Sequence, residues 1–147
     1  MKTMTWRALA MGMSLMAAGA AGAQAPRANL EAGRHRIEVE VAADEQTRQL
    51  GLMYRSHLPA GQGMLFVYPS SLRICMWMRN TLIPLSVAFL DEEGRILNIE
   101  HMTPLNEESH CSVKPARYAL EMNQGWFAGH GVKAGDRIEG VKFLSSK

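Results

Sequence analysis

Beyond its first 25 residues, this sequence has no apolar run long enough to span a bilayer, no internal repeat and no low-complexity segment. A spanning helix needs about 20 strongly apolar residues, so we expect no stable membrane insertion of the mature chain. A Gly-x-Ser-x-Gly elbow and a strand–Gly-rich loop–helix motif are also absent, which argues against two common kinds of catalytic and phosphate-binding site. The acidic run 91–93 is too short for a calcium loop, whose ligands span twelve residues.

The N-terminus has the three parts of a secretory signal peptide. Lys2 and Arg7 supply the positive charge, an apolar run covers residues 8–23, and Ala23-Gln24-Ala25 has the small-x-small pattern of a cleavage site. The apolar run is too short and too rich in glycine for a retained anchor, and no cysteine follows it to carry a lipid. We therefore interpret residues 1–25 as a cleaved signal peptide and expect a periplasmic or secreted protein.

Cleavage would change the composition of the chain. It removes two basic residues and no acidic ones, so the 16 basic and 14 acidic residues become 14 of each. A formally neutral domain lacks the electrostatic attraction that dominates binding to nucleic-acid phosphates, and we expect no nucleic-acid partner. Five of the 11 methionines also leave with the signal.

Cysteine is scarce: the sequence has two, Cys75 and Cys111, both in the mature part. In an oxidising compartment an even number favours a disulfide, which would stabilise the fold by about 4 kcal/mol in the chain-entropy model. Two separate thiols are the alternative, because spacing alone does not show whether the residues meet.

Hydrophobic patterning predicts an α+β, β-rich domain. Alternating and short apolar runs favour about six or seven strands, arranged as a compact mixed or antiparallel sheet or a partly closed barrel. The expected strands cover residues 37–41, 63–67, 74–78, 87–90, 95–102, 117–122 and 137–144. One or two short helices are expected at 45–53, capped by Asp44 with Leu50 and Met53 facing inward, and at 125–132. We expect residues 26–35 to be a flexible leader and residues 36–147 to form a single globular domain.

Five segments of the mature chain form a recognisable set of motifs. They are Gly51-Leu52-Met53-Tyr54-Arg55, Gly63-Met64-Leu65-Phe66, the block from Trp77 to Leu85, the block from Pro115 to Gly125, and Gly135-Asp136. In this order and spacing they resemble the domain of unknown function 192 family. The resemblance implies a small, mostly β fold that is often exported, and it supplies no activity. This chain departs from the family pattern at Ser86, where an aspartate is usual, and at Met76, where an aromatic residue is usual.

The strongest candidate site contains Trp77, Asn80, Thr81, Glu121 and Asn123. Glu121 and Asn123 share one face of a strand by the two-residue period, and a carboxylate in such a strand must be paired or line a cleft. The arginines at positions 55, 79 and 117 are plausible partners. The functional interpretation is a small polar ligand pocket with an aromatic wall; the alternative is a buried network that ties loops to strands.

Two other interpretations remain open. Met76, Met78 and His101 offer thioether and imidazole groups that suit Cu(I), although methionine is also an ordinary core residue. Glu121 is a candidate acid or base in a small periplasmic enzyme, whereas the pairing of any serine with His101, His110 or His130 has no sequence motif in support. We therefore expect a non-enzymatic exported binding or accessory module that holds a small ligand or a partner protein, with no cofactor and no metal assigned.

Overall fold

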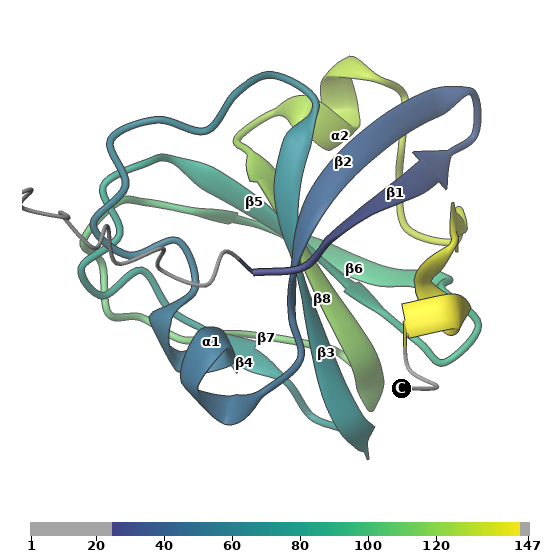
Figure 1. Ribbon diagram of the computed structural model, residues 1–147, viewed down its shortest axis with the longest axis horizontal. Helices are drawn as coiled ribbons and strands as arrows, with labels where there is room; N and C mark the ends of the chain where they lie inside the picture. Colours follow the sequence, from purple (N-terminus) through teal and green to yellow (C-terminus); the bar gives the residue numbers. More distant parts are fainter. Residues whose placement is uncertain (1–24, 145–147) are drawn as a thin grey trace, which may run out of the picture.

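A seven-stranded sheet dominates the computed structural model, which describes residues 25–144 (Figure 1). The strand order is β6-β5-β8-β3-β2-β1-β9, and every neighbouring pair is antiparallel except β2 and β3. The strands are β1 (Arg27–Ala32), β2 (His35–Ala42), β3 (Gln62–Leu72), β5 (Leu85–Leu90), β6 (Ile96–Met102), β8 (Ala116–Asn123) and β9 (Ile138–Glu139). The sheet is therefore mixed and the predicted β-rich class is confirmed.

The sheet curls until its two edge strands approach each other. The segments that lead into β6 and β9 meet in an antiparallel bridge between Arg95 and Arg137. Ile138 donates its backbone N–H to the carbonyl of Gly94 at 2.8 Å. Gly94 has φ of +81°, and a Cβ there would collide with the Ile138 carbonyl, so glycine is required at this contact. The result is the expected partly closed barrel.

Both faces of the central strands are buried. All six residues of β5 are buried, as the continuous apolar run predicts for a strand covered on two sides. One face contributes to an inner core with β1, β2 and α2 (Trp126–Gly129); its large members include Leu30, Ile37, Leu65, Tyr118, Leu120 and Phe127. The other face forms a second core, whose members include Leu52, Met64, Phe66, Ile74, Met76, Met78, Val87 and Phe89.

A short two-stranded sheet and one helix lie beside the second core; Met76 of the small sheet belongs to that core, whereas the helix has no buried residue. Strands β4 (Cys75–Met76) and β7 (His110–Cys111) pair antiparallel. Helix α1 (Glu45–Leu50) begins at Asp44, whose side chain accepts a hydrogen bond from the Thr47 N–H at 2.8 Å, as predicted for an N-cap. In Figure 1, α1 lies near β4, at the end of the barrel away from α2.

Several sequence-based expectations were wrong. Residues 27–32 form β1 rather than a loose leader, since Leu30 and Ala32 are buried against the inner core. Of the final strand expected over residues 137–144, only β9 forms, and the 3-10 helix Val141–Leu144 follows it. Strand β7 lies between the expected strands 95–102 and 117–122 and was not predicted. Leu50 is 53% exposed instead of facing the core, where Leu52 takes its place.

Candidate functional site

Glu121 is the one acidic residue buried in the core among residues 25–144. It lies in β8 between Met64 of β3 and Val87 of β5, on the face that belongs to the second core. The residue is 4% exposed, and its carboxyl group has no hydrogen-bond or ion-pair partner within residues 25–144. Burial raises the pKa of this carboxyl to about 8, because the charged form is poorly solvated there.

A small cavity of about 30 Å³ lies beside Glu121. Its walls come from β3, the β4 segment and α1 with the loop after it; the lining residues are Arg48, Gln49, Leu50, Gly51, Leu52, Met53, Phe66, Met76, Trp77, Thr81 and Glu121. A cavity of this size holds about one water molecule or one polar group of a ligand. Trp77 is 45% exposed, so the indole lies between the cavity and solvent. We call this group of residues the Glu121 pocket.

Strained backbone is concentrated next to the Glu121 pocket. Tyr54, Asn80 and Leu105 are the only non-glycine residues of positive φ within 25–144, at 64°, 53° and 62°. The Tyr54 N–H donates to the Asn80 carbonyl at 2.9 Å, and the Leu105 N–H donates to the carbonyl of Thr81, the residue after Asn80, at 3.0 Å. Such conformations cost free energy and cluster at functional sites. Tyr54 and Leu105 are also exposed.

The structure brings together three of the five predicted site residues. Trp77, Thr81 and Glu121 line the same cavity. Asn80 does not line it; its amide donates to the Tyr54 hydroxyl at 2.9 Å. Asn123 lies on the same strand face as Glu121, but its amide donates to the Leu58 carbonyl at 2.8 Å and holds that loop. These two asparagines therefore organise the loops around the pocket.

The expected arginine partners of Glu121 bind elsewhere. Arg55 makes a two-point ion pair with Glu40, with N–O distances of 2.6 and 2.7 Å. Arg79 lies 3.6 Å from Glu107, and Arg117 donates to a backbone carbonyl in β3. None of these three arginines pairs with the carboxyl of Glu121.

Sequence reasoning did not identify Arg48 and Tyr68 as neighbours of this site. The Arg48 guanidinium lies 5.2 Å from the centre of the Tyr68 ring. The Tyr68 hydroxyl contacts the Met76 sulfur at 3.8 Å, and burial is the main reason that the pKa of Tyr68 is raised. Arg48 belongs to α1 and Tyr68 to β3, so only the packing of the helix against the sheet brings them together.

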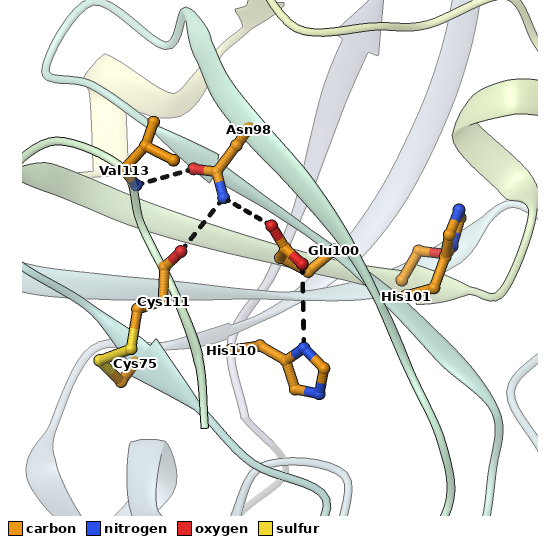
Figure 2. Close-up of polar contacts among 8 residues, drawn as sticks. Cys75, Asn98, Glu100, His101, His110, Cys111 and Val113 are labelled. Carbon is orange, nitrogen blue, oxygen red and sulfur yellow. Dashed lines mark hydrogen bonds and ion pairs between the residues drawn. A yellow bond between two sulfur atoms is a disulfide. The ribbon is translucent and has the colours of Figure 1, made fainter. Parts of the chain in front are cut away.

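Cys75 and Cys111 form a disulfide, which confirms the predicted pair. They lie opposite each other in β4 and β7, with a Cα–Cα distance of 4.0 Å. Figure 2 shows the polar contacts beside this bridge: Asn98 donates to the Cys111 carbonyl and to Glu100, each at 3.1 Å. His110 lies 3.9 Å from Glu100. The disulfide and these contacts fix β4, and therefore Met76 and Trp77, at the pocket wall.

Ser86 and His101 form a hydrogen bond, with 2.8 Å between Oγ and Nδ1. Ser86 is fully buried, and its Oγ also accepts the Gly125 N–H at 3.3 Å. A substrate cannot reach this hydroxyl, so the pair joins β5, β6 and the turn at Gly125 rather than forming a nucleophile and base. His101 itself is exposed.

The suggested copper ligands do not converge. Met76 and Met78 are buried in the second core. Met102 belongs to that core too, so the neighbouring His101 points to the opposite face of β6. Within residues 25–144 no three His, Cys, Asp or Glu side chains are placed to hold a metal ion. In the same range, no helix has the length and apolar character needed to cross a membrane.

Comparisons with known proteins agree on the family and the fold. The chain is similar to a putative transcription regulator from Sinorhizobium meliloti 1021, with 38% identity and a TM-score of 0.73 over 79% of this chain and 93% of that one. It is also similar to a protein of unknown function from Novosphingobium aromaticivorans DSM 12444, with 32% identity and a TM-score of 0.76 over 88% of this chain and 100% of the other. No curated protein matches. The family model described as "Uncharacterized ACR" matches residues 28–140, and the chain therefore belongs to the domain of unknown function 192 (DUF192) family.

Proposed function

We propose that this protein is an exported binding module whose ligand enters the Glu121 pocket. The observation that carries the proposal is a buried carboxyl group without a partner, next to a cavity whose outer wall is a half-exposed tryptophan. An unpaired buried polar group costs roughly 1–3 kcal/mol, so a ligand that supplies the missing hydrogen bond would recover part of that cost. Strained loops held around the same cavity add support.

A screen of small polar fragments by saturation-transfer NMR tests the proposal. We expect hits on the wild-type protein that are lost in Trp77→Ala. Val113→Ala is the matched control, because Val113 is also an exposed apolar residue but does not line the pocket. Hits that persist in Trp77→Ala, or no hits with any fragment class, would contradict the proposal.

Export is part of the proposal and is supported by two observations. The backbone carbonyl of Pro26 accepts a hydrogen bond from Val41 at 2.7 Å, so the sheet begins directly after the expected cleavage point. The Cys75–Cys111 disulfide is typical of oxidising compartments. Expression of the full chain, cell fractionation and N-terminal sequencing should yield a periplasmic or secreted protein that starts at Pro26. A cytoplasmic protein that retains Met1 would contradict export.

A second candidate function is acid–base catalysis by Glu121. The observation in its favour is the pKa of about 8, since a catalytic acid or base works best near the operating pH. Glu121→Gln separates the two candidates once a ligand is found. An enzyme would still bind the ligand but lose turnover, whereas a binding module releases the ligand unchanged in both forms.

We do not extend transcriptional regulation to this chain. Its mature part would be formally neutral, and binding to nucleic-acid phosphates depends on excess positive charge.

A further inference from the structure

We propose that the ligand of the Glu121 pocket is a small carboxylate, bound with one oxygen against the Glu121 carboxyl and its charge facing Arg48. This inference rests on the proposed function and names the chemical class of the ligand. It follows from three features of the pocket: which hydrogen-bonding groups are free, which charges surround them, and how much space there is.

The carboxyl of Glu121 offers a free hydrogen-bond donor in the pocket. The Thr81 hydroxyl donates to the Arg79 carbonyl at 3.1 Å, and the Tyr68 hydroxyl contacts the Met76 sulfur. Glu121 has no partner within residues 25–144. With a pKa near 8, its carboxyl carries a proton at neutral pH and offers one O–H donor. The ligand atom that meets this O–H is therefore an acceptor oxygen.

The charges around the pocket are positive. Arg48 lines it from α1, and its Nη1 donates to the Ala43 and Val67 carbonyls. A guanidinium has five N–H donors, so further donors remain for a ligand. Arg79 adds a second cation, 5.4 Å from the centre of the Trp77 ring, and Glu107 is paired with it.

No other acid lines the pocket, and Glu121 is flanked in the sheet by the apolar Met64 and Val87. With Glu121 protonated, the lining carries a net positive charge, which favours an anion over an ammonium group.

The volume of the cavity limits how much of the ligand can be buried. A volume of about 30 Å³ accommodates only the oxygen end of a ligand. The remainder must lie outside, where Leu50 and Trp77 expose apolar surface, 53% and 45% of each residue. A short alkyl chain attached to a carboxylate satisfies both conditions.

Titrations of the purified protein with butyrate, butyramide and butylammonium test the inference. Saturation-transfer NMR should show butyrate binding most tightly at pH 6. Its affinity should be about tenfold lower at pH 9, where only about a tenth of Glu121 remains protonated. Glu121→Gln keeps a neutral donor and should bind butyrate with the same affinity at both pH values. A drop of equal size in Glu121→Gln would overturn the role of Glu121.

Charge variants test whether the negative charge of the ligand faces Arg48. Arg48→Gln should weaken butyrate more than tenfold and leave butyramide within about twofold, whereas Arg34→Gln, an exposed arginine outside the Glu121 pocket, should change neither. Circular dichroism checks that the variants fold. Preferential binding of butylammonium or butyramide in the Trp77-dependent site would overturn the carboxylate class and leave the binding module intact. If butyrate does not bind while other fragments still bind, the carboxylate class is also overturned and the binding module stands. Only a fragment screen without any hit would contradict the binding function as well.

Discussion

Tyr54 and Asn80 hold each other in left-handed backbone conformations through two reciprocal hydrogen bonds. The Tyr54 N–H donates to the Asn80 carbonyl, and the Asn80 amide donates to the Tyr54 hydroxyl, both at 2.9 Å. The residues are 26 positions apart in the sequence. Their contact links the loop after α1 to the loop after β4, and both loops border the Glu121 pocket.

Substitutions at Asn80 should show that its backbone conformation matters as much as its side chain. Asn80→Ala loses the amide and keeps a Cβ at φ of 53°, where alanine is less tolerated than asparagine, whereas Asn80→Gly loses the same amide without steric strain. We expect the glycine variant to be more stable than the alanine variant by about 1 kcal/mol in urea unfolding. The reverse order of stability would show that the left-handed conformation is not retained in solution.

Removal of the disulfide should cost substantial stability. The bridge spans 36 positions, and the chain-entropy model assigns a loop of that length about 4 kcal/mol. Urea unfolding of the Cys75→Ser, Cys111→Ser double variant should therefore show a much lower free energy of unfolding than the oxidised protein. Reduced wild-type protein is the control and should match the double variant; a match between the double variant and the oxidised protein would exclude a stabilising bridge.

Glu121 should make the folded state less stable as pH rises. Its pKa is raised from 4.5 to about 8 on folding, so between those values the folded state binds more protons than the unfolded state. Stability relative to the unfolded state must then fall with increasing pH across this window, by roughly 1 kcal/mol per pH unit, and level off above pH 8.

The measurement for Glu121 is a comparison of wild-type protein and Glu121→Gln by urea unfolding from pH 5 to pH 9. The difference in unfolding free energy should shift in favour of the glutamine variant as pH rises, because glutamine does not titrate. A difference that stays constant over this range would mean that the carboxyl is not buried in the way the structure shows.

Gly63 permits the close approach of β3 and β8 next to Glu121. A Cβ at this position would collide with the Glu121 carbonyl and the Met122 sulfur. Gly63→Ala should therefore destabilise the fold by about 1–3 kcal/mol, measured by urea unfolding. Gly129→Ala is the matched control, since a Cβ there meets nothing within 4 Å, and equal effects of the two variants would argue against the tight contact.

The sequence predicted some features of the Glu121 pocket and not others. The two-residue period placed Glu121 and Asn123 on one strand face, and both residues lie in β8. The same reasoning offered Arg55, Arg79 and Arg117 as plausible partners of Glu121, and none of them pairs with it, because pairing depends on where the loops place these side chains. It also missed β1, whose few apolar side chains give a weak signal, although Leu30 and Ala32 are buried.

The sequence by itself determined the family resemblance and the β-rich class, because periodicity, composition and short motifs are local properties of the chain. It left the pairing of Cys75 and Cys111 open, and the 4.0 Å between their Cα atoms decided it. Only the tertiary structure decided that the Glu121 carboxyl lacks a partner, that Arg48 and Tyr68 lie beside it and that Ser86 is inaccessible. These properties depend on distances between segments far apart in the sequence. Those distances are set by the curling of the sheet and by the packing of α1 and β4 against it.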